Sequence, residues 1–444
     1  MSEAIPRDFY AEKLVEVNET NAVIATEGIY NEQGALIVAK GMPICKETAR
    51  RIALHKLTKP LDQSISLERI ITSQSFIERL RAMPTHPELI RIFKNERANK
   101  WLQEEADNLS KYPLLVQKLT VMKECMPDCY EDSSFGAVIS LQICEGLDLS
   151  DKDRHAIFLG ALARDIGLLH IDPDVAVKEH GFTAAEWRLY EGHIAIGFKL
   201  LGLAKAPKLA RLALLEHHER ADGFGFPRGR SWPELTLAGQ VVAFSNMTIA
   251  LIDKYVLKMG CSMRALQTIF QVNANQHTRE VAAAALLKLD QIAGPRINLY
   301  GTDSLPKLTS QLCRAHPLIK LLIAQIDEFW QLLEELPEDL DLTPIANALH
   351  DLRRVVVSSG ITDPMLLQWI NGLEADSIED GDMLELENYA LMLEECTWKF
   401  GELFRSIITS PERDRVEAST IAFLRVHYRN IKKTFDLLVK VRDA

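Results

Sequence analysis

Histidines gather in one stretch of this 444-residue chain, where six of the twelve fall between residues 155 and 218. Divalent transition metals prefer imidazole and carboxylate ligands, so an aspartate among these histidines predicts a metal site. The set with that chemistry is Asp165, His193, His217 and His218. From spacing alone, surface or packing roles for these histidines remain the alternative.

The ligands of such a site have to converge from separate elements, and apolar segments near each one predict rigid helices. Asp165 follows the apolar run 156–163, and His193 lies within 186–197. Adjacent residues in mid-helix point about 100° apart. The pair His217-His218 can therefore share one cluster only near a helix end, and the glycine-rich stretch that follows predicts such an end. Residues 237–252 form a fourth apolar helix.

The N-terminal region has a different pattern. Two β-prone runs, Val23–Tyr30 and Ala35–Lys40, flank a short loop that ends in Gly34, which predicts a hairpin. Apolar residues at helical spacing predict a helix over Lys46–Leu57, and Pro60–Leu67 is interpreted as a linker.

From Ser73 onward the apolar spacing is helical almost throughout, and a separate helical region begins after Arg296. Leu318–Leu336 is strongly amphipathic. A capping residue followed by proline predicts three helix starts, at Thr343-Pro344, Asp363-Pro364 and Ser410-Pro411. We therefore expect a mainly α fold in three parts: an N-terminal β-hairpin and helix module over 1–70, a helical domain over 71–300, and a C-terminal helical domain over 301–444.

Charge and composition exclude several classes of protein. The net charge of −11 gives no global attraction to DNA or to an anionic membrane surface. The N-terminus lacks the pattern of a signal peptide, and no window holds 18 apolar residues free of charge. Seven scattered cysteines favour a reducing compartment, so the expected location is the cytoplasm.

The C-terminal region separates its charges. Residues 374–387 carry acids and no Lys or Arg, whereas residues 424–444 are rich in Lys and Arg. A helical bundle with charged faces accounts for this pattern, and so does a homodimer in which these faces pair. The sequence leaves both interpretations open.

A longer motif is more specific. The run from His217-His218-Glu219-Arg220 through Asp222-Gly223-Phe224-Gly225-Phe226-Pro227 resembles the HHExxDGxGYP signature of HD-GYP domains. The order of Arg164-Asp165, His193, the histidine pair and Asn246 is also similar to that family, over about residues 125–300.

This resemblance implies a bacterial, mainly α bundle of the HD superfamily. It implies a centre of two or three metal ions, commonly iron or manganese, that hydrolyses cyclic di-GMP. The loop after the histidines would lie beside the substrate and contact diguanylate cyclase partners of the GGDEF type. The loop residues implied in substrate binding are Arg220, Asp222, Gly223, Gly225, Phe226 and Pro227.

The chain departs from the family at its site. Arg164 replaces the histidine of the HD pair, and Leu168 replaces a lysine. Asp132 stands where the family has an upstream histidine, and Asn246 where it has a closing aspartate. Phe226 replaces the tyrosine of the motif.

By the resemblance, most of the ligands of one metal have changed, while the set of Asp165, His193, His217 and His218 is retained. Arginine keeps its proton and offers no lone pair, so we expect an ion pair between Arg164 and Asp165 in place of one metal. Iron or manganese at one remnant site is the only cofactor expected. Asp165 is then the candidate for a catalytic residue.

Two functions follow. The first is a catalytically degenerate HD-GYP pseudoenzyme that acts in signalling as a regulatory binding or interaction module, with cyclic di-GMP or a diguanylate cyclase as partner. The alternative is an active metal-dependent phosphodiesterase with a reduced metal centre. Of the remaining histidines, His155 is interpreted as a packing residue, and His170 and His180 as surface residues.

Overall fold

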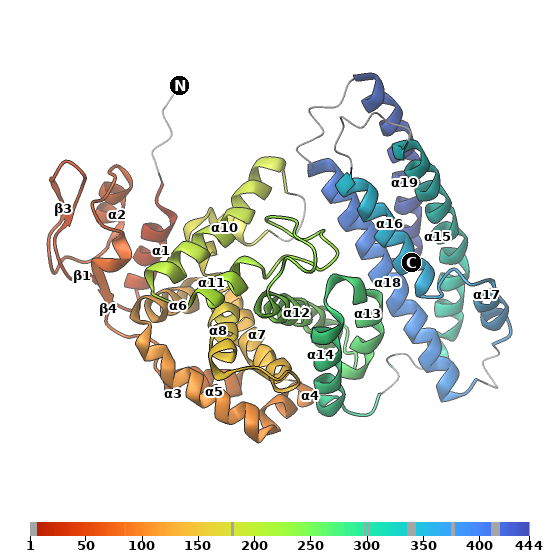
Figure 1. The fold of residues 1–444 in the computed structure, drawn as a ribbon, viewed down its shortest axis with the longest axis horizontal. Helices are drawn as coiled ribbons and strands as arrows, with labels where there is room; N and C mark the ends of the chain where they lie inside the picture. Colours follow the sequence, from red (N-terminus) through yellow and green to blue (C-terminus); the bar gives the residue numbers. More distant parts are fainter. Residues whose placement is uncertain are drawn as a thin grey trace. The chain divides into compact units, whose positions relative to one another are not determined.

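The structure is a computed structural model that describes residues 7–84, 86–178, 182–296, 299, 302–334, 343–373, 378–409 and 418–443. Its contacts divide the chain into two compact units. One contains residues 1–250 and 280–292, and the other contains residues 251–279 and 293–444 (Figure 1). The mainly α fold class is confirmed. The three-part division at residues 70 and 300 stays a prediction.

The N-terminal part begins with a helix that the sequence pattern did not reveal, α1 (Phe9–Asn18), in which the Asp8 carboxylate accepts from the amide of Ala11. The predicted hairpin is present as β2 (Ile29–Tyr30) and β3 (Leu36–Val38), which pair antiparallel. Asn31 closes its turn by accepting from the amides of Gln33 and Ala35.

The linker predicted over 60–67 is wrong. This segment forms the 3-10 turn η1 (Leu61–Gln63) and the strand β4 (Ile65–Leu67). The strand pairs antiparallel with β1 (Val23–Ala25) and buries Ile65 and Leu67. The predicted helix is confirmed as α2 (Lys46–Ala53), which ends four residues before Leu57.

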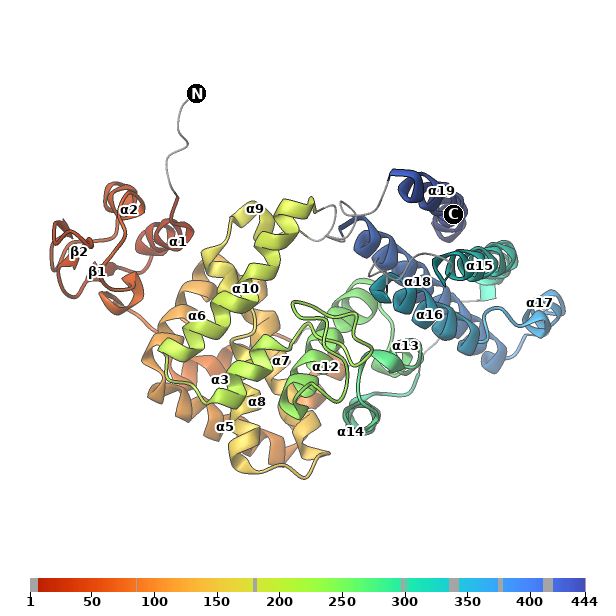
Figure 2. The same ribbon diagram turned by 45° about the horizontal axis from the view of Figure 1, so that its top comes forward.

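The rest of the first unit is helical, and Figure 2 shows its helices from a second direction. A helix with apolar residues on most sides belongs in a core. That holds for α7 and α8, which pack against each other, and α8 also packs on α11. The helical elements of this unit are α3 (Ser73–Ala82), α4 (Pro87–Ile90), η2 (Arg91–Lys94), α5 (Glu96–Asn108), η3 (Leu109–Lys111), α6 (Pro113–Cys125), α7 (Pro127–Glu145), α8 (Asp151–Leu162), η4 (Ile166–His170), α9 (Pro173–Ala176), α10 (Ala184–Leu203), α11 (Lys208–Leu215), α12 (Leu237–Leu251) and α14 (Arg279–Ile292).

The second unit is built around α15, which packs against α16, α17, α18 and α19. Its core contains Ile319, Leu322 and Ile326, on the face that the amphipathic pattern predicted. The elements are the π-helix η5 (Ile252–Lys258), η6 (Met263–Ala265), α13 (Leu266–Val272), η7 (Ala274–Gln276), η8 (Thr302–Ser304), α15 (Leu305–Glu334), α16 (Thr343–Ser358), α17 (Pro364–Asn371), α18 (Asp380–Thr409) and α19 (Ala418–Arg442).

Two of the three predicted helix starts are observed. Asp363 caps α17 by accepting from the amide of Met365, and Pro364 is the first helical residue. The helix α16 begins at Thr343 itself. The start predicted at Ser410-Pro411 lies outside the described residues. Among the helices that the structure describes, none has the length and apolar character needed to cross a bilayer.

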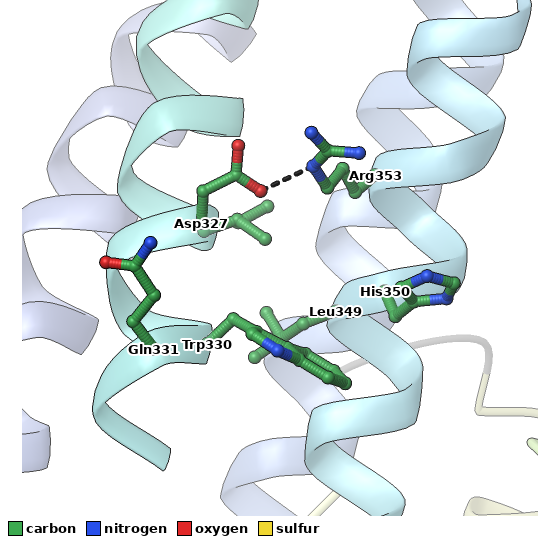
Figure 3. Close-up of a pocket in the computed structure, with 7 residues that line it drawn as sticks. Asp327, Trp330, Gln331, Leu349, His350 and Arg353 are labelled. Carbon is green, nitrogen blue, oxygen red and sulfur yellow. Dashed lines mark hydrogen bonds and ion pairs between the residues drawn. The ribbon is translucent and has the colours of Figure 1, made fainter. Parts of the chain in front are cut away.

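A pocket of about 340 Å³ lies between α15 and α16 (Figure 3). Trp330 and His350 line it, and at one end Asp327 accepts from Arg353. Both side chains of this ion pair are exposed, with 41% of the Asp327 side chain and 46% of the Arg353 side chain accessible to solvent. Exposed pairs of this kind contribute little free energy. This pair therefore does not give the pocket a buried charge with which to orient a ligand.

Candidate metal centre

The elements of the first unit bring four predicted ligands to one point. Asp165 stands just beyond α8 and caps η4, and His193 lies in α10. His217 and His218 follow the last residue of α11, at the helix end that the histidine pair predicted. One ligand atom from each side chain lies within 4.8 Å of every other. We refer to these four residues as the Asp165 cluster.

Hydrogen bonds fix how two of the histidines face the cluster. Nδ1 of His193 bonds the carbonyl of Tyr190, and Nδ1 of His217 bonds the carbonyl of Leu214 at 2.6 Å. A carbonyl only accepts, so each Nδ1 carries the proton and each Nε2 keeps its lone pair. Imidazoles that bind metals are oriented in this way.

The Nε2 atoms that face the cluster have no hydrogen-bond partner among the described residues, although those of His193 and His217 lie 3.8 and 3.7 Å from Oδ1 of Asp165. The Nε2 atoms of His193, His217 and His218 are buried, and within the described structure none has a hydrogen bond. A buried polar atom without a partner is costly, so three at one point call for a ligand. A divalent ion fits this donor set of three imidazole nitrogens and one carboxylate.

Burial and charge set the protonation states. Burial, and then the neighbouring His217, lower the pKa of His193 to about 4. Burial and the same neighbour lower the pKa of His218 well below its ordinary value. Burial alone would raise the pKa of Asp165, but the Arg164 guanidinium together with His217 and His193 holds it well below its usual range. Neutral imidazoles beside an ionised carboxylate are the states that bind a metal.

The distances set the rearrangement that an ion requires. Two ligands bound at about 2.1 Å from one ion lie at most about 4.2 Å apart. The ligand atoms of the Asp165 cluster spread to 4.8 Å, so they have to close by a few tenths of an ångström. Rotations of buried side chains supply that much movement.

Arg164 occupies the other side of Asp165. Its Nε donates to Oδ2 of Asp165 at 2.9 Å, so the predicted ion pair is present. The arginine is 2% exposed, and its Nη1 has no hydrogen-bond partner among the described residues. A Cβ at Gly136 would lie 2.1 Å from that Nη1, so the guanidinium fits against α7 only because residue 136 is glycine.

The other altered positions lie in three different elements. Asp132 lies in α7 and is not a member of the Asp165 cluster, although Ser133 beside it contacts Oδ2 of Asp165 at 3.4 Å. Leu168 is buried in η4, and Asn246 is half-buried in α12.

The residues predicted to bind substrate form the loop after the histidine pair. Arg220 and Asp222 bind each other through two hydrogen bonds, so they neutralise each other. Gly223 has a φ of +85°, which favours glycine. A Cβ at Gly225 would lie 2.3 Å from Cα of Glu219, so that position also requires glycine.

The aromatic rings of Trp187, Tyr190 and Phe226 adjoin the Asp165 cluster. Phe226 immediately precedes Pro227, and its ring stacks on that of His218 with the ring centroids 4.3 Å apart. Trp187 meets Phe226 edge-on at 5.1 Å, and Tyr190 lies 5.0 Å from His193. Trp187 and Tyr190 were missed in the sequence, although their spacing of three residues in a helix that carries His193 was a usable signal.

Two buried glutamates that the sequence analysis did not single out anchor this loop. Glu216 accepts from Arg228 and from both the amide and the hydroxyl of Thr236. Glu219 accepts from the amides of Arg228 and Arg230. Glu219 was visible as the third residue of the motif, but its backbone partners lie 9 and 11 residues further on.

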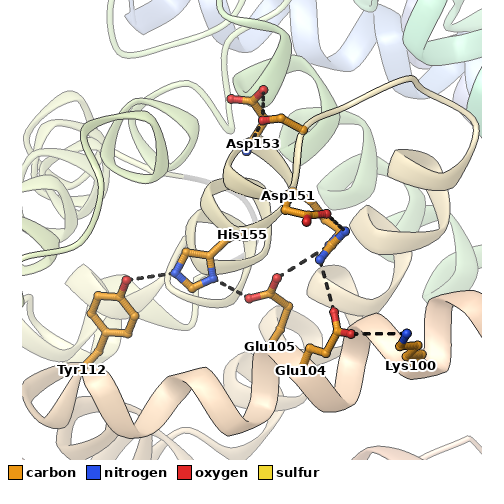
Figure 4. A network of polar contacts seen from close by, with 9 residues as sticks. Lys100, Glu104, Glu105, Tyr112, Asp151, Asp153 and His155 are labelled. Carbon is orange, nitrogen blue, oxygen red and sulfur yellow. Dashed lines mark hydrogen bonds and ion pairs between the residues drawn. The ribbon is translucent and has the colours of Figure 1, made fainter.

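The other histidines have separate roles. His155 is held between Tyr112 and the buried Glu105, away from the Asp165 cluster, as a packing role predicted (Figure 4). The surface role predicted for His170 is wrong, because it contacts Lys118 at 2.9 Å and stacks on the buried Tyr10. His180 lies outside the described residues.

Comparison with known proteins finds relatives for the part of the chain that contains this site. The profile of the HD domain family matches residues 94–279, a stretch that contains the whole Asp165 cluster. A cyclic di-GMP phosphodiesterase of Thermotoga maritima is 29% identical over 156 residues, which is 34% of this chain and 42% of the relative. The 3'3'-cGAMP-specific phosphodiesterase 3 of Vibrio cholerae is 34% identical over 153 residues, which is 34% of this chain and 33% of the relative.

A third relative, the cyclic di-GMP phosphodiesterase response regulator RpfG of Xanthomonas campestris, is 28% identical over 158 residues, 34% of this chain and 42% of the relative. The matched stretch thus spans between a third and about two fifths of these relatives. The resemblance seen in the sequence is confirmed to this extent: residues 94–279 match the HD domain family, and these relatives are cyclic dinucleotide phosphodiesterases.

Proposed function

We propose that this protein is a catalytically degenerate HD-GYP protein that binds a cyclic dinucleotide, cyclic di-GMP first, and acts as a regulatory module. The observation that carries the proposal is the guanidinium of Arg164, bound to Asp165 at 2.9 Å and 2% exposed. A fixed positive charge on that side of the carboxylate repels a second metal ion there and leaves room for one ion at most.

The residues that would hold that ion are those of the Asp165 cluster. A divalent ion bound there supplies a positive charge that polarises a phosphate and lowers the pKa of a bound water. The residues of the chain do the rest. His193 and His217 present lone pairs fixed by backbone carbonyls. Trp187 and Phe226 are half-buried rings of the kind on which nucleobases stack, although Phe226 already packs one face on His218 and Trp187 stacks with Tyr190.

The test is to incubate the purified protein with cyclic di-GMP and Mn²⁺, to measure binding by calorimetry, and to measure product by chromatography. A parallel arm uses 3'3'-cGAMP. We expect the nucleotide to bind, with at most one Mn²⁺ per chain. We expect linear dinucleotide to form no faster than it does in a sample without protein.

The alternative is an active phosphodiesterase with one metal ion, and the intact Asp165 cluster favours it. Hydrolysis that requires Mn²⁺ and disappears in His217→Ala would establish the alternative and overturn the proposal. Binding of neither nucleotide would overturn both.

The ion pair makes a further prediction. In Arg164→Gln the guanidinium no longer competes with the ion for Asp165, so Mn²⁺ affinity should rise about tenfold, or about 1.4 kcal/mol. Calorimetric titration measures this, with Arg220→Gln as the control because Arg220 pairs with Asp222 in the loop. Unchanged or weaker Mn²⁺ binding in Arg164→Gln would show that Arg164 does not restrict the centre.

A further inference from the structure

A buried ammonium group lies where the N-terminal elements pack on the helical domain. Lys118 in α6 is 0% exposed, and its Nζ lies 2.5 Å from a carboxylate oxygen of Asp62 and 2.9 Å from Nε2 of His170. It also lies 3.0 Å from the centroid of the Tyr10 ring. An ammonium has three protons, and these three contacts provide an anion, a lone pair and a π face for them.

The partners of Lys118 come from three other elements. Tyr10 lies in α1, Asp62 in η1, and His170 is the last residue of η4. The rings of Tyr10 and His170 are stacked, with centroids 4.7 Å apart. We call these four residues the Lys118 cluster. The Lys118 cluster connects α1 and η1, through Tyr10 and Asp62, to the last residue of η4.

The protonation states suit these contacts. Burial and the charge of Lys118 lower the pKa of His170 to about 2, so its imidazole stays neutral and accepts. Burial lowers the pKa of Lys118 to about 8, and Asp62 opposes this shift, so the ammonium form predominates at neutral pH.

The other end of η4 is the metal centre. Asp165 precedes η4, and its carbonyl accepts from the amide of Leu168 at 2.9 Å. Gly167 passes so close to α10 that a Cβ there would lie 1.9 Å from the carbonyl oxygen of His193. A 3-10 helix rises about 2 Å per residue, so His170 lies roughly 10 Å along η4 from Asp165. A shift of His170 is therefore carried to the contact between η4 and His193.

Stability alone is a weak reason for such a cluster. A buried ion pair is often matched or exceeded in stability by apolar residues of similar volume. A positioning role accounts for the same contacts directly, because they fix one end of the segment whose other end presents Asp165.

We propose that Lys118 is a positioning residue for the metal centre, and that the N-terminal elements supplying Tyr10 and Asp62 are part of the support of that centre. This inference rests on the proposed binding of a divalent ion by the Asp165 cluster. It adds that the N-terminal elements influence that binding through η4.

The test is the Mn²⁺ affinity of Lys118→Met in the full chain, measured by calorimetry. Loss of a partner bonded directly to a ligand typically costs about 10–100-fold in metal affinity, and because Lys118 acts one element further away we expect a loss of about 10-fold, at the lower end of this range. The matched control is Lys288→Met, which removes a largely buried lysine that pairs with Glu145 at 2.8 Å on α7. The control should bind Mn²⁺ as the wild type does.

A second variant separates position from stability. Lys118→Met combined with Asp62→Leu removes the unpaired carboxylate, so the free energy of unfolding should recover while Mn²⁺ affinity stays low. Recovery of both together would show a purely structural role and overturn the inference, as would wild-type affinity in Lys118→Met.

Hydrogen exchange gives a readout that needs no metal. The amides of residues 166–171 should exchange faster in Lys118→Met than in the wild type, and those of α14 should not change. If the wild type bound no Mn²⁺, the metal proposal would fail, and equal exchange at 166–171 would separately overturn the link between Lys118 and η4.

Discussion

His155 and Asp165 stand ten residues apart in the sequence, and each belongs to a cluster of histidine and carboxylate. Around His155 both imidazole nitrogens have partners, because Tyr112 bonds Nε2 and Glu105 bonds Nδ1. Figure 4 shows this chain of contacts continuing through the carboxylates that surround Arg154. In the Asp165 cluster, Nδ1 of His193 and of His217 is used, but Nε2 is not.

The difference separates two uses of the same residue types. Satisfied nitrogens hold α5 and α8 together and leave no lone pair for a ligand. Buried nitrogens without partners keep a free energy cost that a bound ion relieves. Composition and spacing do not distinguish these cases, whereas hydrogen-bond partners do.

The largest expected effect is the loss of metal binding in His217→Ala. This change removes a ligand, so Mn²⁺ affinity should fall by more than about 100-fold, beyond the usual loss for an outer-shell partner. Calorimetry measures the affinity, and metal analysis of the purified protein checks it.

His155→Ala is the counterpart in this comparison. It should leave Mn²⁺ affinity unchanged and lower the free energy of unfolding by about 1–3 kcal/mol, because Glu105 is 2% exposed and loses a partner. Equal losses of Mn²⁺ affinity in His217→Ala and His155→Ala would refute the conclusion that only the Asp165 cluster binds the ion.

The next prediction compares two glycines near His193. In Gly167→Ala the new methyl would lie 1.9 Å from the carbonyl oxygen of His193, so η4 and α10 have to separate. Overpacking of this kind costs about 1–3 kcal/mol. Urea denaturation measures the cost.

Gly192→Ala is the matched control for Gly167→Ala. Its methyl would meet nothing within 4 Å, and the position is inside α10. Replacing a helical glycine with alanine stabilises by about 0.5–1 kcal/mol. Destabilisation by both substitutions to the same extent would show that the close approach of η4 has no special role.

A last prediction concerns the pH dependence of the free energy of unfolding of the metal-free protein. An unfolded histidine takes up its proton near pH 6.5, whereas the pKa of His193 is lowered to about 4. Between these values the unfolded state binds more protons, so acidification lowers the free energy of unfolding by up to about 1.4 kcal/mol per pH unit. Denaturation series at several pH values should show a shallower slope in His193→Gln, and an unchanged slope would refute this assignment.

The sequence predicted the helical fold well because 3.6-residue periodicity is a local signal. It failed where the partner is distant. The strand at Ile65–Leu67 has no strong pattern of its own and forms because Val23–Ala25 pairs with it. Likewise α1 buries Tyr10 and Leu14, but it is only 10 residues long, and the helical period is a weak signal over so short a segment.

The candidate site followed the same rule. The ligands were predictable because each stands at a recognisable place in the motif, and the Arg164–Asp165 pair because the residues are adjacent. The Lys118 cluster was not predictable, because Tyr10, Asp62, Lys118 and His170 lie on four elements that only the fold brings together. The role of Glu216 was hidden for a related reason, since its partners are in the loop that it anchors.

The anchoring of that loop has a consequence for protein engineering. Glu216 and Glu219 leave α11 in the same turn as the histidine pair, and their partners all lie between Arg228 and Thr236. The segment from Lys208 to Thr236 is thus closed by its own side chains, and Gly239 completes it by leaving room for the Glu216 carboxylate. Residues 208–239 therefore keep two ligands and their loop in one internally bonded segment, whereas a scaffold that received this segment would have to supply Asp165 and His193 itself. A graft that stopped at the last residue of the motif would leave Glu216 without the hydrogen-bond donors of Arg228 and Thr236 and would lose the geometry that it was meant to transfer.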